Sequence, residues 1–154
     1  MSVSDKSGNY VYFLDTNIFL RFLVRDHEES YQDCQRLFEL IRHGSLGALT
    51  STVVLIEINY TLLSFYGLPK AQVVTGLKSI TSLTNLKIVD KFNLQKTMGL
   101  YEENRVKFVD CLIASLDEVA QGQWRVVSYD KEFDKLGAKR REPHQVISTV
   151  KDRK

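Results

Sequence analysis

The chain is poor in cysteine and histidine, and this scarcity limits the kinds of site it can build. Of its 154 residues, two are cysteine and three are histidine. Cys34 and Cys111 form no CxxC pair and suggest no disulfide framework, so we expect both in the core of a protein from the reducing cytoplasm. His27, His43 and His144 are scattered, and no grouping has the spacing of a zinc site.

The chain also lacks long apolar runs and a strong net charge. No segment approaches the roughly 18 apolar residues of a membrane span, so we expect no membrane partner. The polar start, MSVSDKSGN, lacks the apolar core of a secretion signal, and we expect a disordered tail over residues 1–9. The net charge of +2 does not indicate a nucleic-acid binder, but clustered Lys and Arg could still bind phosphates beside an acidic site.

What remains is typical of one globular domain, with 44% hydrophobic and 26% charged residues and no internal repeat. We expect this domain over residues 10–150 and a charged tail over residues 151–154. The patterns predict strands over residues 10–14, 46–49, 86–89, 125–128 and 145–148. They predict helices over residues 16–24, 28–42, 52–65, 69–83, 93–103, 109–120 and 131–136, and a charged loop at 139–142. Alternating strands and helices predict a three-layer α/β/α fold with a central parallel sheet flanked by helices.

Two acids follow predicted strands. In YVYFLDTNIFLRFL, Asp15 directly follows a run of strand formers, and Asp130 comes two residues after RVVS. Ligands of parallel sheets bind outside the carboxyl ends of the strands, so both acids are candidates for a site there. Each could instead cap the helix that follows it. We expect Thr16 to cap the first helix and to leave Asp15 free for an ion.

Two further acids stand on apolar helices. Glu57 is the only charge in VVLIEINYTLL, a helix that is apolar nearly all round and should be buried. Asp110, in VKFVDCLIASL, shares its helix face with Ile113 and Ala114. A buried, unpaired carboxylate is unfavourable by several kcal/mol or has a raised pKa. Taken singly, Glu57 could lie at a helix edge or pair with a lysine, and Asp110 could be a helix-start acid.

Together the four acids predict a metal site. A doubly wound sheet can bring strand ends and adjoining helix faces into one pocket. Four carboxylates would repel one another there unless a cation neutralised them. Mg²⁺ and Mn²⁺ prefer such oxygen ligands, so we expect one of these ions as the cofactor.

The segments FLDTNIFL, VVLIEINYTL, FVDCLIAS and VVSYDKEFDKL, in this order, resemble the PIN-domain ribonucleases. The likeness is greatest to the VapC-type toxins of toxin–antitoxin pairs and covers residues 11–148. It implies a single PIN-like nuclease domain, a Mg²⁺- or Mn²⁺-dependent endoribonuclease site, an RNA substrate, frequent homodimers and a small antitoxin partner. The family's acidic quartet is matched by Asp15, Glu57, Asp110 and Asp130.

The resemblance also suggests roles for these residues. Asp15 and Asp110 are expected to be direct metal ligands, while Glu57 completes the site or orients a water, and Asp130 binds a second metal or acts through water. Asn17, Ser128 and Thr16 are expected to support the carboxylates by hydrogen bonds. Asp134 could take the place of Asp130, which we prefer because it lies nearer the strand end.

Four basic residues near the opening of the predicted acidic site are candidates for contacts with RNA phosphates, although each could be a solvated side chain instead. They are Arg21, Arg105, Lys107 and Lys131.

Three other functions remain open. A DNA-directed nuclease of related design would use the same acids. A phosphoacceptor receiver domain needs paired acids after its first strand, and LDTN supplies one. A non-catalytic RNA-binding module would have no reason to keep lone acids on apolar helices.

Overall fold

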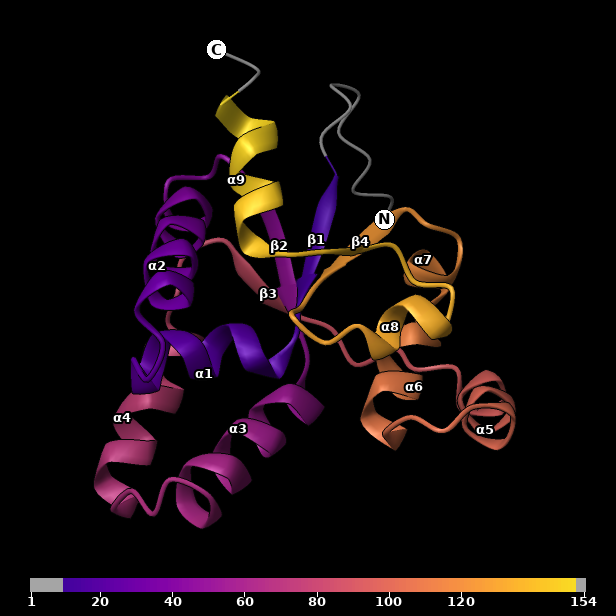
Figure 1. Cartoon of the computed structure of the whole chain (residues 1–154), viewed down its shortest axis with the longest axis horizontal. Coiled ribbons are helices and arrows are strands. Elements are labelled where there is room, and N and C mark those ends of the chain that lie inside the picture. The colour runs from indigo at the N-terminus through magenta and orange to yellow at the C-terminus, as the bar shows by residue number, and fades with distance from the viewer. Residues whose placement is uncertain (1–9, 152–154) are drawn as a thin grey trace.

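The computed structural model describes residues 10–151 and shows one five-stranded parallel sheet between helical layers (Figure 1). The strands are β1 (Val11–Leu14), β2 (Gly47–Thr50), β3 (Leu86–Ile88), β4 (Trp124–Val127) and β5 (Arg140–Arg141). They pair in the order β3-β2-β1-β4-β5, and every pairing is parallel. The predicted α/β/α fold with a central parallel sheet is confirmed.

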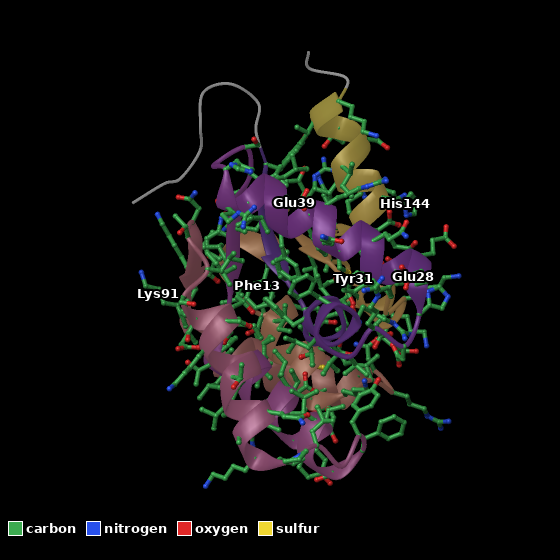
Figure 2. The ribbon with its side chains drawn as sticks, turned by 90° about the vertical axis from the view of Figure 1, so that its left-hand side faces the viewer. Phe13, Glu28, Tyr31, Glu39, Lys91 and His144 are labelled. Carbon is green, nitrogen blue, oxygen red and sulfur yellow. The ribbon has the colours of Figure 1, made fainter. Side chains whose placement is uncertain are left out.

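Helices lie on both sides of this sheet. On one side lie α1 (Thr16–Val24), α2 (Glu28–Arg42) and α9 (Pro143–Lys151). On the other side lie α5 (Leu94–Glu103), α6 (Phe108–Ala114), α7 (Asp117–Ala120) and α8 (Glu132–Lys135). The remaining pair, α3 (Thr52–Ser64) and α4 (Lys70–Thr81), extends beyond the strands' carboxyl ends. Figure 2 looks onto α2 and α9, with Glu28 and Glu39 exposed on α2.

Apolar patterning accounts for the core. The central strand β1, with sequence VYFL, is buried at every position because helices cover both faces of a parallel sheet. Its Phe13 is fully buried and lies in the interior of the molecule (Figure 2). On α2, the buried residues recur at helical spacing, as predicted: they are Cys34, Leu37, Phe38 and Ile41.

The carboxyl ends of the central strands meet at one edge of the sheet. Leu14 is in register with Val127, and the Asp15 N–H donates to the Val127 carbonyl at 3.1 Å. The Thr50 hydroxyl donates to the Leu14 carbonyl at 3.0 Å, so β2 ends at the same level. Since α1 and α3 start directly after β1 and β2, their first turns lie over this edge.

The strand predicted over residues 145–148 is wrong, and so is the loop predicted at 139–142. Residues 145–148 belong to α9, which begins at Pro143 with Val146 and Ile147 buried. Proline is favourable in the first turn of a helix. The periodicity of a short apolar run such as QVIS cannot distinguish a helix from a strand. The last strand is instead β5, whose two arginines pair with β4 through their backbone.

Two further predictions need correction. The single helix predicted over residues 109–120 is two helices, α6 and α7, separated at Ser115 and Leu116. The Ser115 hydroxyl donates to the Leu112 carbonyl at 2.7 Å and accepts from the Asn93 N–H at 3.2 Å, so it competes with regular helix bonding. The full burial expected of the Glu57 helix is also wrong, because α3 exposes Ile56 and Tyr60.

The predicted tails fall largely outside the described range. Residues 1–9 and 152–154 lie beyond it, and Lys151 closes α9. Within residues 10–151, no helix combines the length and apolarity that a membrane crossing needs. Cys34 and Cys111 are buried free thiols.

Candidate active site

Asp15 is held at the carboxyl end of β1 by hydrogen bonds to both of its carboxylate oxygens. Its Oδ1 accepts from the Thr16 N–H at 2.8 Å, while Oδ2 accepts from the Ser128 hydroxyl at 2.6 Å and the Asn17 amide at 3.2 Å. Asp15 is therefore the N-cap of α1, and the predicted Thr16 cap is wrong. The strand ends at Leu14 and the helix begins at Thr16, so only Asp15 has the extended backbone of a cap.

Thr16 instead links Asp15 to the next acid. Its hydroxyl donates to Glu57 Oε1 at 2.7 Å, which joins the first turn of α1 to the middle of α3. Glu57 is half-buried and has this polar partner, so it is not the unpaired buried carboxylate that its apolar surroundings predicted.

Asn17 and Ser128 hold the turn after β4 against α1. The Asn17 amide donates to the Ser128 hydroxyl oxygen at 2.9 Å, and its carbonyl accepts from the Tyr129 N–H at 3.2 Å. Ser128 also accepts from the Asp130 N–H at 3.0 Å. The positions of Asp15 and Asp130 are therefore coupled through two polar side chains.

Asp130 has partners on two sides. Its Oδ1 accepts from the Glu132 N–H at 3.0 Å, and its Oδ2 lies 3.8 Å from Lys107 Nζ. The alternative acid, Asp134, pairs with the Arg140 guanidinium at 3.1 Å and is more exposed. Asp130 is thus the acid that joins the Asp15 network.

Asp110, on α6, is the acid with an unsatisfied atom. Its side chain is 3% exposed, and its buried Oδ2 has no hydrogen-bond partner among residues 10–151. A buried carboxylate oxygen without a donor is rare because desolvation is then uncompensated. Such an atom needs a proton or a cation that the other described side chains do not supply.

Burial and mutual repulsion raise the pKa of two of these acids. The pKa of Asp110 is raised to about 7, chiefly by burial and also by the charges of Asp15 and Asp130, while Lys107 opposes them. Burial also raises the pKa of Asp15 to about 6, against the hydrogen bonds from Ser128 and Thr16. Glu57 and Asp130 contribute repulsion to Asp15 as well. The four predicted acids are therefore close enough to interact electrostatically.

Although the four acids interact, they do not form a complete metal-binding site in this structure. Within residues 10–151, no three His, Cys, Asp or Glu side chains are gathered tightly enough to enclose an ion. The carboxylates of Asp15, Glu57 and Asp130 accept hydrogen bonds from other groups of the protein. The donor set is nevertheless all carboxylate, and it includes the orphaned Asp110 Oδ2, which suits a hard divalent cation.

One residue beside the site was missed in the sequence. Asp90, just after β3, accepts from the Ser51 hydroxyl at 2.7 Å, the Thr52 N–H at 2.9 Å and the Thr52 hydroxyl at 2.7 Å. It thus anchors the start of α3, the helix that carries Glu57. Its position after a predicted strand was the available signal, the same one that selected Asp15.

The basic candidates are spread over different parts of the molecule. Arg21 pairs with Asp26 at 2.9 Å near the end of α1. Lys131 is exposed next to Asp130. Arg105 and Lys107 lie in the segment between α5 and α6, where they line a cleft.

Comparisons with known proteins agree with this fold. The sequence matches the model of the PIN domain over residues 12–139. No curated protein sequence matches the chain significantly.

Three solved structures are similar in fold. VapBC2 from Rickettsia felis, bound to a DNA fragment from their promoter, shares 22% identity with a TM-score of 0.59, covering 86% of this chain and 98% of that chain. PAE2754 from Pyrobaculum aerophilum shares 16% identity with a TM-score of 0.66, covering 93% and 96%. VapC20 from Mycobacterium tuberculosis, a Sarcin-Ricin loop cleaving toxin, shares 17% identity with a TM-score of 0.57, covering 82% and 95%.

At these identities the structural matches show a shared fold. The family match is stronger, since it spans well over half of the sequence and includes Asp15, Glu57, Asp110 and Asp130. The chain belongs to the PIN-domain family.

Proposed function

We propose that this protein is a Mg²⁺- or Mn²⁺-dependent endoribonuclease and the toxin of a toxin–antitoxin pair. The observation that carries the proposal is the orphaned Asp110 Oδ2, on an acid whose pKa is raised by burial and by the charges of the neighbouring acids. Membership of the PIN-domain family supports a nuclease. The fold shared with VapC20, a Sarcin-Ricin loop cleaving toxin, supports RNA as the substrate.

The residues present fit a hard divalent cation. Asp15 and Asp110 would hold it directly, and Glu57 and Asp130 would complete the site, because the cation would offset the repulsion among the four acids. When bound, the ion supplies neutralisation of the phosphodiester charge and lowers the pKa of the attacking water.

The chain's own residues prepare the site for this chemistry. Asp15 Oδ1 accepts from the Thr16 N–H and keeps its other lone pair available, whereas Oδ2 accepts from both the Ser128 hydroxyl and the Asn17 amide. The Thr16 hydroxyl orients Glu57, which can accept a proton from a water positioned beside it. Lys107, 3.8 Å from Asp130 and exposed, can exchange this weak pair for a substrate phosphate.

The test is cleavage of total RNA by purified protein in Mn²⁺, compared with Asp110→Asn and with excess EDTA. Fragments should form only with the wild-type chain and the metal. Undiminished cleavage in EDTA would reject a metal mechanism. Incubation with DNA tests the related DNA-directed nuclease, and a stoichiometric RNA complex that survives in Mg²⁺ without cleavage would favour a binding module.

The partner proteins are also proposals. One face of α3 exposes apolar residues at helical spacing, namely Ile56, Tyr60 and Leu63. We assign this face to contact with a second copy of the chain. The fold shared with the VapBC2 complex supports a small antitoxin partner, and we propose that this partner obstructs the acidic site with a basic side chain. If a co-purified partner left cleavage unchanged at saturation, its inhibitory role would be wrong.

A further inference from the structure

A cleft of about 630 Å³ adjoins the acids, and of its lining residues only Lys107 has a role in the proposed function. It is lined by the end of α5, the segment that leads into α6, and Glu132 of α8. These three helices lie on the same side of the sheet (Figure 1). The volume falls within the roughly 300–1,000 Å³ range of small-molecule sites, so one nucleotide can enter it.

Two observations place this cleft next to the proposed site of cleavage. Lys107 lines the cleft, and its Nζ lies 3.8 Å from Asp130 Oδ2. Glu132 lines the cleft on the other side, and its N–H donates to Asp130 Oδ1 at 3.0 Å. A strand whose phosphate reaches the acids would therefore have its adjoining nucleotide at the cleft.

The lining combines an aromatic ring with free positive charge. Tyr101 is 49% exposed, and its ring is braced edge-to-face by Phe108 with the centroids 5.3 Å apart. Arg105 is exposed, and none of the ion pairs found within residues 10–151 involves it. A braced ring loses little conformational freedom on stacking, and an unpaired guanidinium is available to a phosphate.

We propose that this cleft is a nucleotide subsite, in which Tyr101 stacks on one unpaired base of single-stranded RNA and Arg105 binds its phosphate. The proposal rests on the proposed function, since that function places RNA at the neighbouring acids. Proteins that bind single strands combine aromatic platforms with cationic side chains in this way. The acids in the lining do not oppose it: Glu132 pairs with Lys135 at 3.1 Å, and Glu102 can accept hydrogen bonds from a base edge.

Fluorescence of 2-aminopurine tests the stacking directly, because stacking on an aromatic ring quenches it. The probe is a set of short single-stranded RNAs, each with 2-aminopurine at one position, titrated in excess EDTA so that cleavage plays no part. Wild-type protein should quench one position of the bound strand. Tyr101→Ala should abolish this quenching and weaken binding about tenfold, whereas Tyr101→Phe should keep both.

Two further variants complete the test. Arg105→Ala should weaken binding at low salt and lower the salt slope by about one, with quenching at saturation unchanged. Tyr10→Ala is the matched control, because Tyr10 is also an exposed tyrosine but lies before β1, at the opposite edge of the sheet. It should behave as wild type.

The outcomes separate this subsite from the nuclease proposal. If Tyr101→Ala binds and quenches like wild type while RNA is still cleaved in Mn²⁺, the subsite is wrong and the nuclease stands. If quenching depends on Tyr101 but no cleavage occurs, the subsite stands and the nuclease is wrong. If Tyr101→Ala changes only the oligomeric state, the cleft is a protein contact and the subsite is overturned.

Discussion

Asp15 and Asp110 differ in the hydrogen bonds that the protein donates to their carboxylate oxygens. Asp15 accepts hydrogen bonds at both oxygens, whereas Asp110 keeps a buried oxygen without a partner in the described chain. Replacing a carboxylate by an amide therefore has different consequences at the two positions, although the substitution is the same.

The first prediction concerns these two variants without metal. Asp110→Asn removes a repelled charge at nearly constant shape, so it should be as stable as wild type or more stable by about 1–2 kcal/mol. Asp15→Asn should be less stable than Asp110→Asn by about 1–2 kcal/mol, because its new N–H₂ group must face the Ser128 hydroxyl or the Thr16 N–H. Denaturant unfolding in EDTA measures both. Asp15→Asn equal to or more stable than Asp110→Asn would contradict the hydrogen-bond assignment.

The second prediction is a pH dependence. Since the folded pKa of Asp110, about 7, lies above its ordinary value of about 3.9, the ionised form destabilises the fold. This penalty is absent below about pH 4, grows as pH rises, and is complete above about pH 7. The stability gap between Asp110→Asn and wild type should therefore widen from pH 4.5 to pH 7.5. A gap independent of pH in metal-free melts would show that Asp110 does not titrate in this range.

At the level of elements, the position of Glu57 depends on how α3 begins. Ser51 is the N-cap of α3, and its hydroxyl oxygen accepts from the Val53 N–H at 3.3 Å. The Ser51 hydroxyl donates to Asp90, which also accepts two bonds from Thr52. Asp90, two residues after the end of β3, thus anchors the start of α3, the helix that follows β2.

The third prediction follows from this anchor. Asp90→Ala should lower stability by about 1–2 kcal/mol through loss of the helix-start bonds. It should also reduce the Mn²⁺-induced rise in melting temperature, because α3 would carry Glu57 away from Thr16. Asn93→Ala is the control, since Asn93 caps α5 by accepting from the Lys96 N–H at 3.0 Å. It should lose similar stability yet keep the Mn²⁺ response; an equal loss of response would show a merely structural effect.

On the scale of the whole molecule, metal binding and folding should be coupled. The carboxylates that follow β1, stand on α3 and α6, and lie in the turn after β4 repel one another only when the chain is folded. A cation that binds them therefore stabilises the native state as a whole.

The fourth prediction is the size of this coupling. Mn²⁺ at a hundredfold excess over its Kd should stabilise the wild-type protein by about 2.7 kcal/mol, a rise in Tm of about 5–10 °C for a domain of this size. Asp110→Asn should lose most of this gain together with most of the activity. Thermal melts with and without Mn²⁺ make the comparison, and an equal gain in both proteins would remove Asp110 from the metal site.

By itself the sequence determined the parallel α/β fold and most of its elements, including β1, α2 and the start of α3. It also singled out Asp15, Glu57, Asp110 and Asp130. These features are local: apolar periodicity distinguishes strands from long helices, and an acid at a strand end or on an apolar helix is visible without any tertiary contact.

Only the tertiary structure decided how these parts meet. The two-residue strand β5 exists through backbone pairing with β4 and leaves no periodic signal in the sequence. Asp90 anchors a helix that begins 38 residues earlier in the chain, and the segment before α6 brings Lys107 to Asp130. Such contacts join residues that are distant in sequence, so they depend on strand order and on how the helices pack, which local patterns do not specify.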